Sequence, residues 1–357
     1  MPQQILITGG TGFIGSHLAR KLLSLGYSVA VLGRRPADSS LIDLHGGDPA
    51  LDVLIGDLSD GRLLDRALGD AETIFHKASS YRDATGSPIE DVLHSNIRGT
   101  QALIAALRRG KHRVRRILFD SSISVYGEGN YLCDRCGIVR PSVRSARVVL
   151  ETQCFDPPCP NCSGRIQPQA TPETAALNGA SAYARSKKTQ ETLMQSAARE
   201  VGFDLVIFRY ATVYGPGQTS SSPYARFIDV LRTGGTVIVN EDGRQRRDFV
   251  YVDDVVRANV IALERDTTGV HIYNVGTGMD TPLIEFVSYA RDFAPRQSGT
   301  PPGGIEVTGR MVAGDVRHCK IDCSLLEKEL GFKAEVSWKT GVHLWLASLP
   351  ATTASAP

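Results

Sequence analysis

The sequence predicts an α/β fold built on a doubly wound parallel sheet. Short apolar runs typical of buried strands alternate with amphipathic stretches such as residues 14–25 and 100–107. A glycine-rich turn joins the first such run to the first helical stretch, and 357 residues suffice for one large domain or two interlocked ones. Alternation of this kind is typical of βαβ units. The expected strands are residues 5–8, 29–32, 53–55, 73–75, 117–119, 205–208 and 271–273.

The composition excludes several classes of partner. Hydrophobic residues make up 42% and charged residues 22%, which are ordinary values for a globular protein. The net charge of +2 gives no general attraction to nucleic acid or anionic lipid. No apolar run approaches the roughly 20 residues that span a bilayer. A strand-like segment at residues 4–8 leaves no room for a signal peptide, so we expect a cytoplasmic protein without nucleic-acid or membrane partners.

Three regions interrupt the alternation and predict the domain organisation. Residues 128–170 are rich in Cys, Pro and Arg, residues 214–248 combine Gly, Pro and Ser with a run of charge, and residues 292–315 look like a loop. We therefore expect a dinucleotide-binding domain of residues 1–127, 171–213 and 245–275, an insert at 128–170, a smaller substrate-binding region of residues 214–244 and 276–349, and a flexible tail at 350–357.

The N-terminal glycine loop predicts a dinucleotide cofactor. In Thr-Gly-Gly-Thr-Gly-Phe-Ile-Gly, Gly9 permits a sharp turn and Gly12 lets backbone N–H groups approach a pyrophosphate. Gly15 lets the helix pack closely on the strand. Phe13 and Ile14 belong to the same cofactor loop. Its position between a strand and a helix favours the Rossmann arrangement over a simple glycine-rich turn.

The second strand bears on the choice between NAD and NADP. An acidic residue at its end would hold the ribose 2′-hydroxyl of NAD, but Gly33 stands there and Arg34 follows. Glycine leaves room for a 2′-phosphate, and a guanidinium pairs with one. These residues favour NADP, while NAD stays open. Asp57 and Leu58, after the third strand, are expected at the adenine.

A serine-rich strand end and a helix supply the candidate catalytic residues. Tyr183 and Lys187 are four residues apart and share one face of a helix. An ammonium beside a phenol lowers the phenol pKa from about 10, so Tyr183 can act as acid or base on an alcohol. Ser122 is expected to hydrogen-bond the same substrate oxygen.

These motifs together resemble an extended short-chain dehydrogenase of the nucleotide-sugar epimerase and dehydratase family, over nearly the whole chain. The matching stretches are residues 8–15, 56–58, 76–79, 96–100, 121–127, 183–187, 209–216 and 247–250. The resemblance implies that Ala78 and Asn96 lie at the cofactor, that His76 packs there rather than acting as an acid, and that the protein is a homodimer. The residues expected at the substrate are Ser124, Tyr210, Thr212, Arg247 and Arg310. Arg247 is expected at the nucleotide diphosphate, and Arg310 is expected to replace an arginine that many family members have where this chain has Val312.

Departures from the family pattern narrow the reaction. The 4,6-dehydratases of the family carry Thr-Asp-Glu where this chain has Ser122-Ile123-Ser124, so no carboxylate is available there for dehydration. The chain most resembles the subgroup that includes dTDP-L-rhamnose 4-epimerase. We therefore expect a 4-epimerase of a dTDP- or UDP-linked hexose. An NADPH-dependent reductase of a nucleotide-linked 4-keto sugar and a non-catalytic cofactor sensor or scaffold are the alternatives.

Four cysteines in the insert predict a structural zinc site. Cys133 and Cys136 form one Cys-x-x-Cys pair, and Cys159 and Cys162 form another. Two such knuckles supply four thiolates to a tetrahedral zinc, and a closed four-thiolate site is structural. A redox dithiol or two unliganded pairs are the alternatives. Three further cysteines lack partner spacing and are expected to be ordinary residues: Cys154, Cys319 and Cys323.

Overall fold

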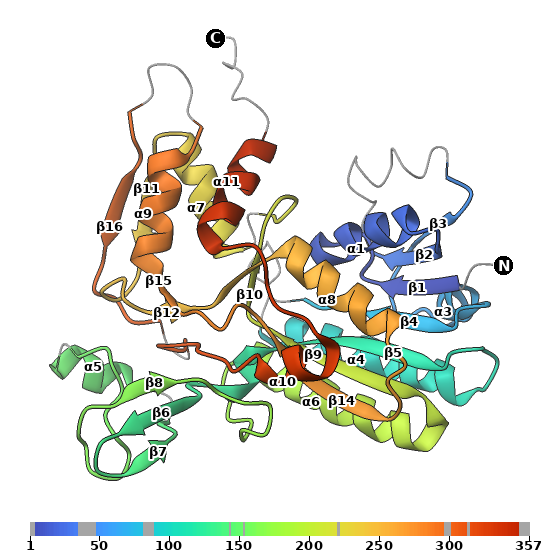
Figure 1. Cartoon of the computed structure of the whole chain (residues 1–357), viewed down its shortest axis with the longest axis horizontal. Coiled ribbons are helices and arrows are strands. Elements are labelled where there is room, and N and C mark those ends of the chain that lie inside the picture. The colour runs from blue at the N-terminus through green and yellow to red at the C-terminus, as the bar shows by residue number, and fades with distance from the viewer. Residues whose placement is uncertain are drawn as a thin grey trace.

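Seven parallel strands form the central sheet of the computed structural model (Figure 1). The structure describes residues 4–34, 48–80, 89–142, 144–152, 154–219, 222–295, 301–312 and 315–349, so the expected tail lies outside the described residues. The strand order is β14-β9-β5-β4-β1-β2-β3. The chain adds strands first on one side of β1 and then on the other, which confirms a doubly wound sheet. Their bounds are β1 Gln4–Thr8, β2 Ser28–Gly33, β3 Leu51–Ile55, β4 Thr73–His76, β5 Arg116–Ser122, β9 Asp204–Tyr210 and β14 Val270–Val275.

Helices cover both faces of this sheet. Strand side chains alternate between two apolar cores, with Ile5 and Ile7 in one and Leu6 in the other. The first core also contains α1 (Phe13–Ser24), α8 (Val252–Glu264) and α10 (Ser324–Leu330). The second contains α3 (Gly61–Leu68), α4 (Ile89–Arg108) and α6 (Ala182–Ala197), which a π-helical turn, η2 (Ala198–Gly202), extends. Burial on both faces explains why the strands lack polar alternation.

A smaller lobe stands on the carboxyl side of the sheet. An aromatic core joins its elements, and the rings of Phe249 and Phe286 stack with centroids 4.1 Å apart. The expectation that residues 292–315 form only a loop is wrong, because β16 pairs in parallel with β11 along its length. The lobe comprises α7 (Pro223–Arg232), α9 (Leu283–Phe293), α11 (Trp338–Ser348) and the strand pairs β10 (Thr212–Tyr214) with β13 (Phe249–Tyr251), β11 (Thr236–Val239) with β16 (Gly304–Val307), and β12 (Arg246–Arg247) with β15 (Thr281–Pro282).

The insert folds as a separate small unit beneath this lobe, drawn in green in Figure 1. Three short antiparallel strands pair in the order β7-β6-β8 (Gly137–Val139, Asn130–Cys133 and Gln167–Gln169), and α5 (Ala146–Thr152) follows β7. Its core is small and consists of Tyr131, Cys133, Val139 and Cys159. Two of these, Cys133 and Cys159, are candidate metal ligands. So few apolar residues make a weak core on their own.

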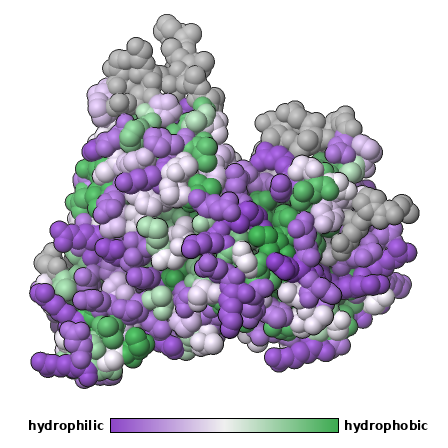
Figure 2. All heavy atoms as spheres, in the orientation of Figure 1, coloured by the Kyte–Doolittle hydropathy of each residue, from purple (hydrophilic) through white to green (hydrophobic). Residues whose placement is uncertain are grey.

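The face shown in Figure 2 is mostly hydrophilic. Hydrophobic residues gather there in an area over the sheet domain and in a smaller one at the lower end of the insert. Leu132 and Ile138 of the insert are exposed. Among the described helices, none is both long and apolar enough to span a membrane.

Candidate active site and metal centre

The glycine loop between β1 and α1 forms a cradle that side chains would fill. A Cβ on Gly9 would lie 2.7 Å from the Ala78 nitrogen, and Gly9 has a φ of +72°. A Cβ on Gly15 would lie 2.3 Å from the Gly9 carbonyl oxygen. Gly12 is the N-cap of α1 and offers no side-chain acceptor to the first turn. The loop therefore presents backbone N–H groups to an anion at a helix N-terminus, as a dinucleotide pyrophosphate requires.

The ends of β2 and β3 flank this cradle. A Cβ on Gly33 would lie 2.0 Å from the Thr11 hydroxyl oxygen, and the next residue, Arg34, is exposed. No carboxylate therefore stands at the expected acidic position of β2. Asp57 is exposed and accepts hydrogen bonds from the Ser59 nitrogen and hydroxyl, whereas Leu58 is buried. Phe13 and Ile14 begin α1 and pack partly buried against the lobe core and the sheet core, respectively.

Two polar residues hold the loop after β4. Asn96 on α4 accepts a 2.7 Å hydrogen bond from the Ser80 nitrogen and donates a 3.0 Å bond to the Ser80 oxygen. His76 lies between the hydroxyls of Thr8 and Thr100, at 2.7 and 2.9 Å. Burial, together with the charges of two neighbouring lysines, lowers the His76 pKa to about 3. The imidazole is therefore neutral and serves as packing.

The candidate catalytic residues converge where β5 ends against α6. Ser122 caps the 3₁₀ turn η1 (Ile123–Tyr126) by accepting a 3.2 Å hydrogen bond from the Ser124 nitrogen. Tyr183 lies in the first turn of α6, and the Lys187 ammonium is 5.9 Å from its ring centroid. That ammonium also donates a 2.7 Å bond to the Asp120 carbonyl, which ties α6 to β5 two residues before Ser122. Burial lowers the Lys187 pKa to about 8.

Ser124 and Thr212, two of the predicted substrate residues, differ in how their polar groups are engaged. The Ser124 hydroxyl is buried and has no partner within the described residues. Thr212 is half-buried, and its nitrogen donates a 2.8 Å bond to the Asp248 oxygen, which places it beside Arg247. An orphaned buried hydroxyl is costly unless something else satisfies it. Ser124 is therefore suited to bind a ligand.

Tyr210 does not lie where the sequence predicts. Its hydroxyl is buried and contacts the Asn259 amide at 2.7 Å and the Lys77 ammonium at 3.5 Å. Lys77 in turn donates to Asp120 at 2.7 Å and to Asn259 at 2.9 Å. The aromatic body of Tyr210 belongs to the sheet core, and its polar end completes this buried cluster rather than a substrate contact.

Arg247 is buried, and hydrogen bonds from its Nη1 and Nη2 hold it in place. Its guanidinium donates to both carboxylate oxygens of Asp315 at 3.1 Å and to the Arg317 carbonyl at 3.1 Å. Arg310, by contrast, is exposed, and its carbonyl accepts a 2.9 Å bond from the Glu241 nitrogen. The two predicted substrate arginines thus differ: Arg247 is fixed in place, and Arg310 lies on the surface.

The four insert cysteines form one cluster. Their sulfur atoms all lie within 4.8 Å of one another, and those of Cys133 and Cys162 are 3.6 Å apart. Thiolates around a tetrahedral zinc lie roughly 3.8 Å apart. Cys133 and Cys136 bound the turn between β6 and β7, and the other pair lies in the turn before β8. Neither pair starts a helix, which disfavours a redox dithiol. The donor set therefore fits structural zinc.

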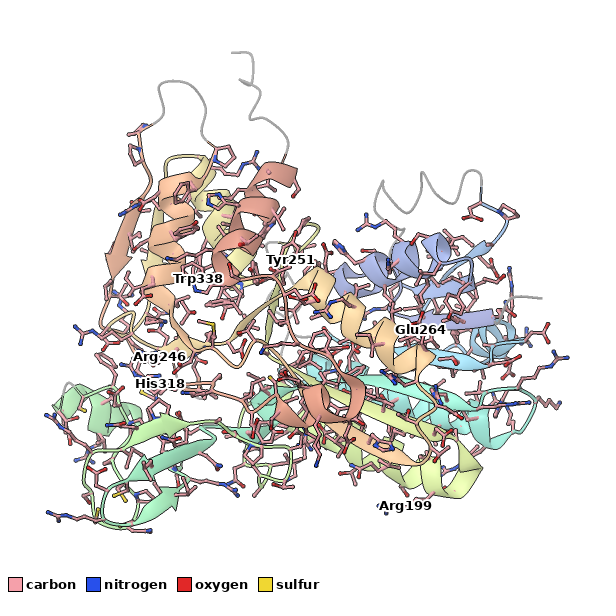
Figure 3. The ribbon with its side chains drawn as sticks, viewed as in Figure 1. Arg199, Arg246, Tyr251, Glu264, His318 and Trp338 are labelled. Atoms are coloured by element: carbon pink, nitrogen blue, oxygen red, sulfur yellow. The ribbon has the colours of Figure 1, made fainter. Side chains whose placement is uncertain are left out.

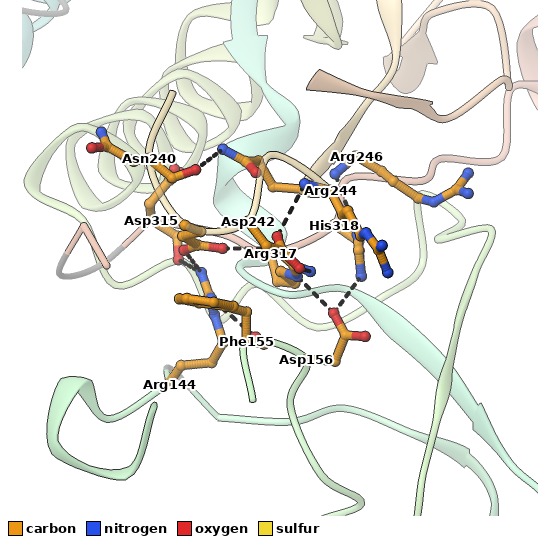
Figure 4. Close-up of polar contacts among 12 residues, drawn as sticks. Arg144, Phe155, Asp156, Asn240, Asp242, Arg244, Arg246, Asp315, Arg317 and His318 are labelled. Atoms are coloured by element: carbon orange, nitrogen blue, oxygen red, sulfur yellow. Dashed lines mark hydrogen bonds and ion pairs between the residues drawn. The ribbon is translucent and has the colours of Figure 1, made fainter. Parts of the chain in front are cut away.

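A second buried charge cluster, absent from the sequence-based expectations, connects the insert to the lobe. The Arg144 side chain is 3% exposed and forms ion pairs with Glu128 at 3.2 Å and Glu241 at 2.9 Å. Arg317 pairs with Asp156 at 2.6 Å and with Glu241 at 2.9 Å (Figure 4). Figure 3 places His318 and Arg246 together between the insert and the lobe. We call this set the junction network: Glu128, Arg144, Asp156, Glu241, Asp242, Asp315, Arg317 and His318.

The comparisons with known proteins cover almost the whole chain. The model of the NAD dependent epimerase/dehydratase family matches residues 5–141 and 148–276. The chain is 29% identical to a dTDP-L-rhamnose 4-epimerase of Burkholderia thailandensis (97% of this chain and 95% of that protein) and 28% identical to a putative UDP-glucose 4-epimerase of Methanocaldococcus jannaschii (95% of each). The solved structure of MoeE5 with UDP-glucuronic acid and NAD superposes with a TM-score of 0.75 at 27% identity, over 96% of this chain and 98% of that one.

Proposed function

Because the chain belongs to the NAD dependent epimerase/dehydratase family, we propose that it is a nucleotide-sugar 4-epimerase of the kind that acts on dTDP-L-rhamnose. The observation that supports this proposal is that Lys187 lies beside the Tyr183 ring and donates to the Asp120 carbonyl, two residues before Ser122 on β5. No acid stands beside Ser122, where a dehydratase needs one.

The mechanism assigns one task to each residue. Tyr183 removes the proton of the sugar C4 hydroxyl and later returns it. The loop with Gly9, Gly12 and Gly15 would hold a nicotinamide dinucleotide, which would supply reversible hydride transfer at C4 of the sugar. Lys187 favours the Tyr183 phenolate through its charge, and Ser122 donates a hydrogen bond to the same sugar oxygen. The unpartnered Ser124 hydroxyl holds the sugar during its turn between the two half-reactions.

A substitution of the tyrosine tests this assignment. Tyr183→Phe removes the acid–base group but keeps the ring, so turnover should fall by at least about a thousandfold while the melting temperature stays unchanged. Near-normal epimerisation by a correctly folded Tyr183→Phe enzyme would overturn the mechanism. The assay is NMR detection of a C4 epimer from dTDP- and UDP-sugars, dTDP-L-rhamnose first, without added cofactor.

A specific observation favours a second candidate, an NADPH-dependent reductase of a nucleotide-linked 4-keto sugar. Gly33 carries no carboxylate that would repel a 2′-phosphate, and the exposed guanidinium of Arg34, the next residue, can pair with one. We propose NADP as the preferred cofactor. Binding of NADP at least tenfold tighter than NAD, lost in Arg34→Ala, supports this preference, and tighter binding of NAD overturns it. Conversion of 4-keto sugars only with added NADPH identifies the reductase.

We further propose that the cysteine cluster holds one structural zinc. The geometry of the four sulfur atoms supports the zinc, and metal analysis should find one zinc per chain, absent from a Cys133→Ser/Cys159→Ser variant. We also propose that the protein is a homodimer through α4 and α6. These two helices pack side by side, and a hollow on them is lined by Gln101, Ile104, Arg108, Leu193 and Ser196. A monomer by light scattering would contradict the dimer.

A further inference from the structure

We propose that the metal-binding insert is a positioning element of the substrate site, which fixes Arg247 for a nucleoside diphosphate through residues 315–318. The inference rests on the proposed function, because it takes Arg247 as the diphosphate contact. It adds a role in substrate binding to the insert, which the proposed function leaves without one.

The first step is the hold of residues 315–318 on Arg247. All three of its strongest partners outside its own strand are in this segment: the two oxygens of Asp315 at 3.1 Å and the carbonyl of Arg317 at 3.1 Å. Because the arginine is buried, its guanidinium has one arrangement as long as this segment stays in place. Both bonds to Asp315 come from one guanidinium nitrogen, Nη2, and the bond to the Arg317 carbonyl comes from the other, Nη1, so the segment fixes the plane of the guanidinium.

The second step is the hold of the insert on residues 315–318. The carboxylate of Glu128 accepts hydrogen bonds from the Arg317 backbone nitrogen at 3.0 and 3.2 Å. Arg144 donates to the Asp315 carbonyl at 3.0 Å (Figure 4). Asp156 pairs with the Arg317 guanidinium and with His318, at 2.6 and 3.3 Å. The insert therefore binds both the main chain and the side chains of the segment that fixes Arg247.

The third step links these contacts to the cysteine cluster. Tyr131 donates a 3.0 Å bond to Glu128 and lies two residues before Cys133 on β6. Arg144 donates a 3.1 Å bond to the Phe155 carbonyl, and Asp156 lies three residues before Cys159. Two of the three insert segments that reach residues 315–318 thus lead to metal-ligand positions, and Arg144, the third, is hydrogen-bonded to the residue before Asp156. A metal that joins the two Cys-x-x-Cys pairs would hold Glu128 and Asp156 at a fixed separation.

The test compares Arg144→Leu with the matched control Arg147→Leu, three residues further on and exposed in α5. Arg144→Leu should raise the Kd for dTDP and UDP and the KM for the sugar nucleotide about tenfold or more. Its kcat should change less than about threefold, and its affinity for the cofactor should stay unchanged. Arg147→Leu should match the wild type in all four quantities. Should Arg144→Leu misfold, Arg144→Lys, which keeps the charge but not the fork of donors, replaces it.

A second measurement addresses the metal itself. Chelation of zinc should weaken dTDP binding of the full-length protein by a similar factor, cofactor binding should persist, and added zinc should restore the affinity. Unchanged dTDP and UDP binding in both Arg144→Leu and the chelated protein, with wild-type turnover intact, overturns the positioning role alone. A wild-type protein that neither binds these nucleotides nor turns over their sugars overturns the proposed function and this inference together.

Discussion

Two of the buried charge clusters in the described part of the chain differ in what they join. The first consists of Lys77, Asp120, Asn259 and Tyr210, and every member comes from the central sheet, its carboxyl edge or α8. The junction network instead joins the insert, the loop after β11 and residues 315–318. Both clusters bury charge, but only the first lies inside a single core.

This difference predicts different consequences of damage. The side chains of Lys77 and Asp120 are 2% and 9% exposed, so loss of one leaves an uncompensated charge within the sheet domain itself. In the junction network, undocking returns the charges to water while the sheet domain remains folded. The first cluster should therefore control global stability, and the second should control local order and substrate affinity.

The largest expected effect is that of Lys77→Met. It should lower the free energy of unfolding by about 3–5 kcal/mol, because Asp120 would stay buried without its partner. The double variant Lys77→Met/Asp120→Leu should recover most of this loss, since an apolar pair replaces a charged one. Urea unfolding followed by circular dichroism measures both. Equal losses in the single and double variants would show that packing rather than charge determines the effect.

Arg317→Met should have a smaller and more local effect. It should lower the free energy of opening of the junction by about 3 kcal/mol, because Glu241 and Asp242 lose their shared cation. Hydrogen exchange should quicken in α5 and residues 315–318 but not in β1, β4 or β5. Faster exchange throughout the central sheet would erase the proposed distinction between the two clusters.

The pH profile of kcat/KM tests whether the junction network influences the catalytic lysine. Lys187 is cationic below its pKa of about 8 and neutral above it, so kcat/KM should fall about tenfold per pH unit once pH rises past this value. Lys187→Arg, a permanent cation, should lose this alkaline limb if it retains activity. Arg144→Leu should keep the limb at the same pH, and a displaced limb would show that the junction acts on the chemistry as well as on affinity.

The smallest effect is expected for the exposed pair Arg147–Glu151 on α5. Arg147→Leu should change the free energy of unfolding by less than about 0.5 kcal/mol, because water screens the pair. It removes the same charge as Arg144→Leu, from the same insert. A loss comparable with that of Arg317→Met would mean that the net charge of the insert, not its buried contacts, matters.

The sequence was a sound guide where local pattern determines structure. The strands of the sheet, the glycine cradle and the two Cys-x-x-Cys pairs each depend on residues close together in the chain. The strand β16 was missed because Gly304–Val307 pairs with β11, whose residues are far away in the sequence. Short strands of this kind depend on the partner more than on their own propensity.

Tyr210 and the two charge clusters were harder to predict for the same physical reason. Lys77 contacts Asp120 and Asn259, which are 43 and 182 positions away, and no local pattern encodes such pairs. One signal was present, since Lys77 and Asp120 each follow an apolar run that reads as a buried strand. Charges at such positions are rarely buried unless paired, so two of opposite sign predict each other.

The junction also sets an order in which the protein can be completed during synthesis. The central sheet receives its last strand at residues 270–275, whereas Arg144 must wait for Asp315, 171 residues later in the chain. A nascent chain can thus form the cofactor cradle and the cysteine cluster before Arg247 acquires its acceptors. The acceptors of Arg247 therefore join the protein only near the end of synthesis, shortly before α10 completes the core on one face of the central sheet.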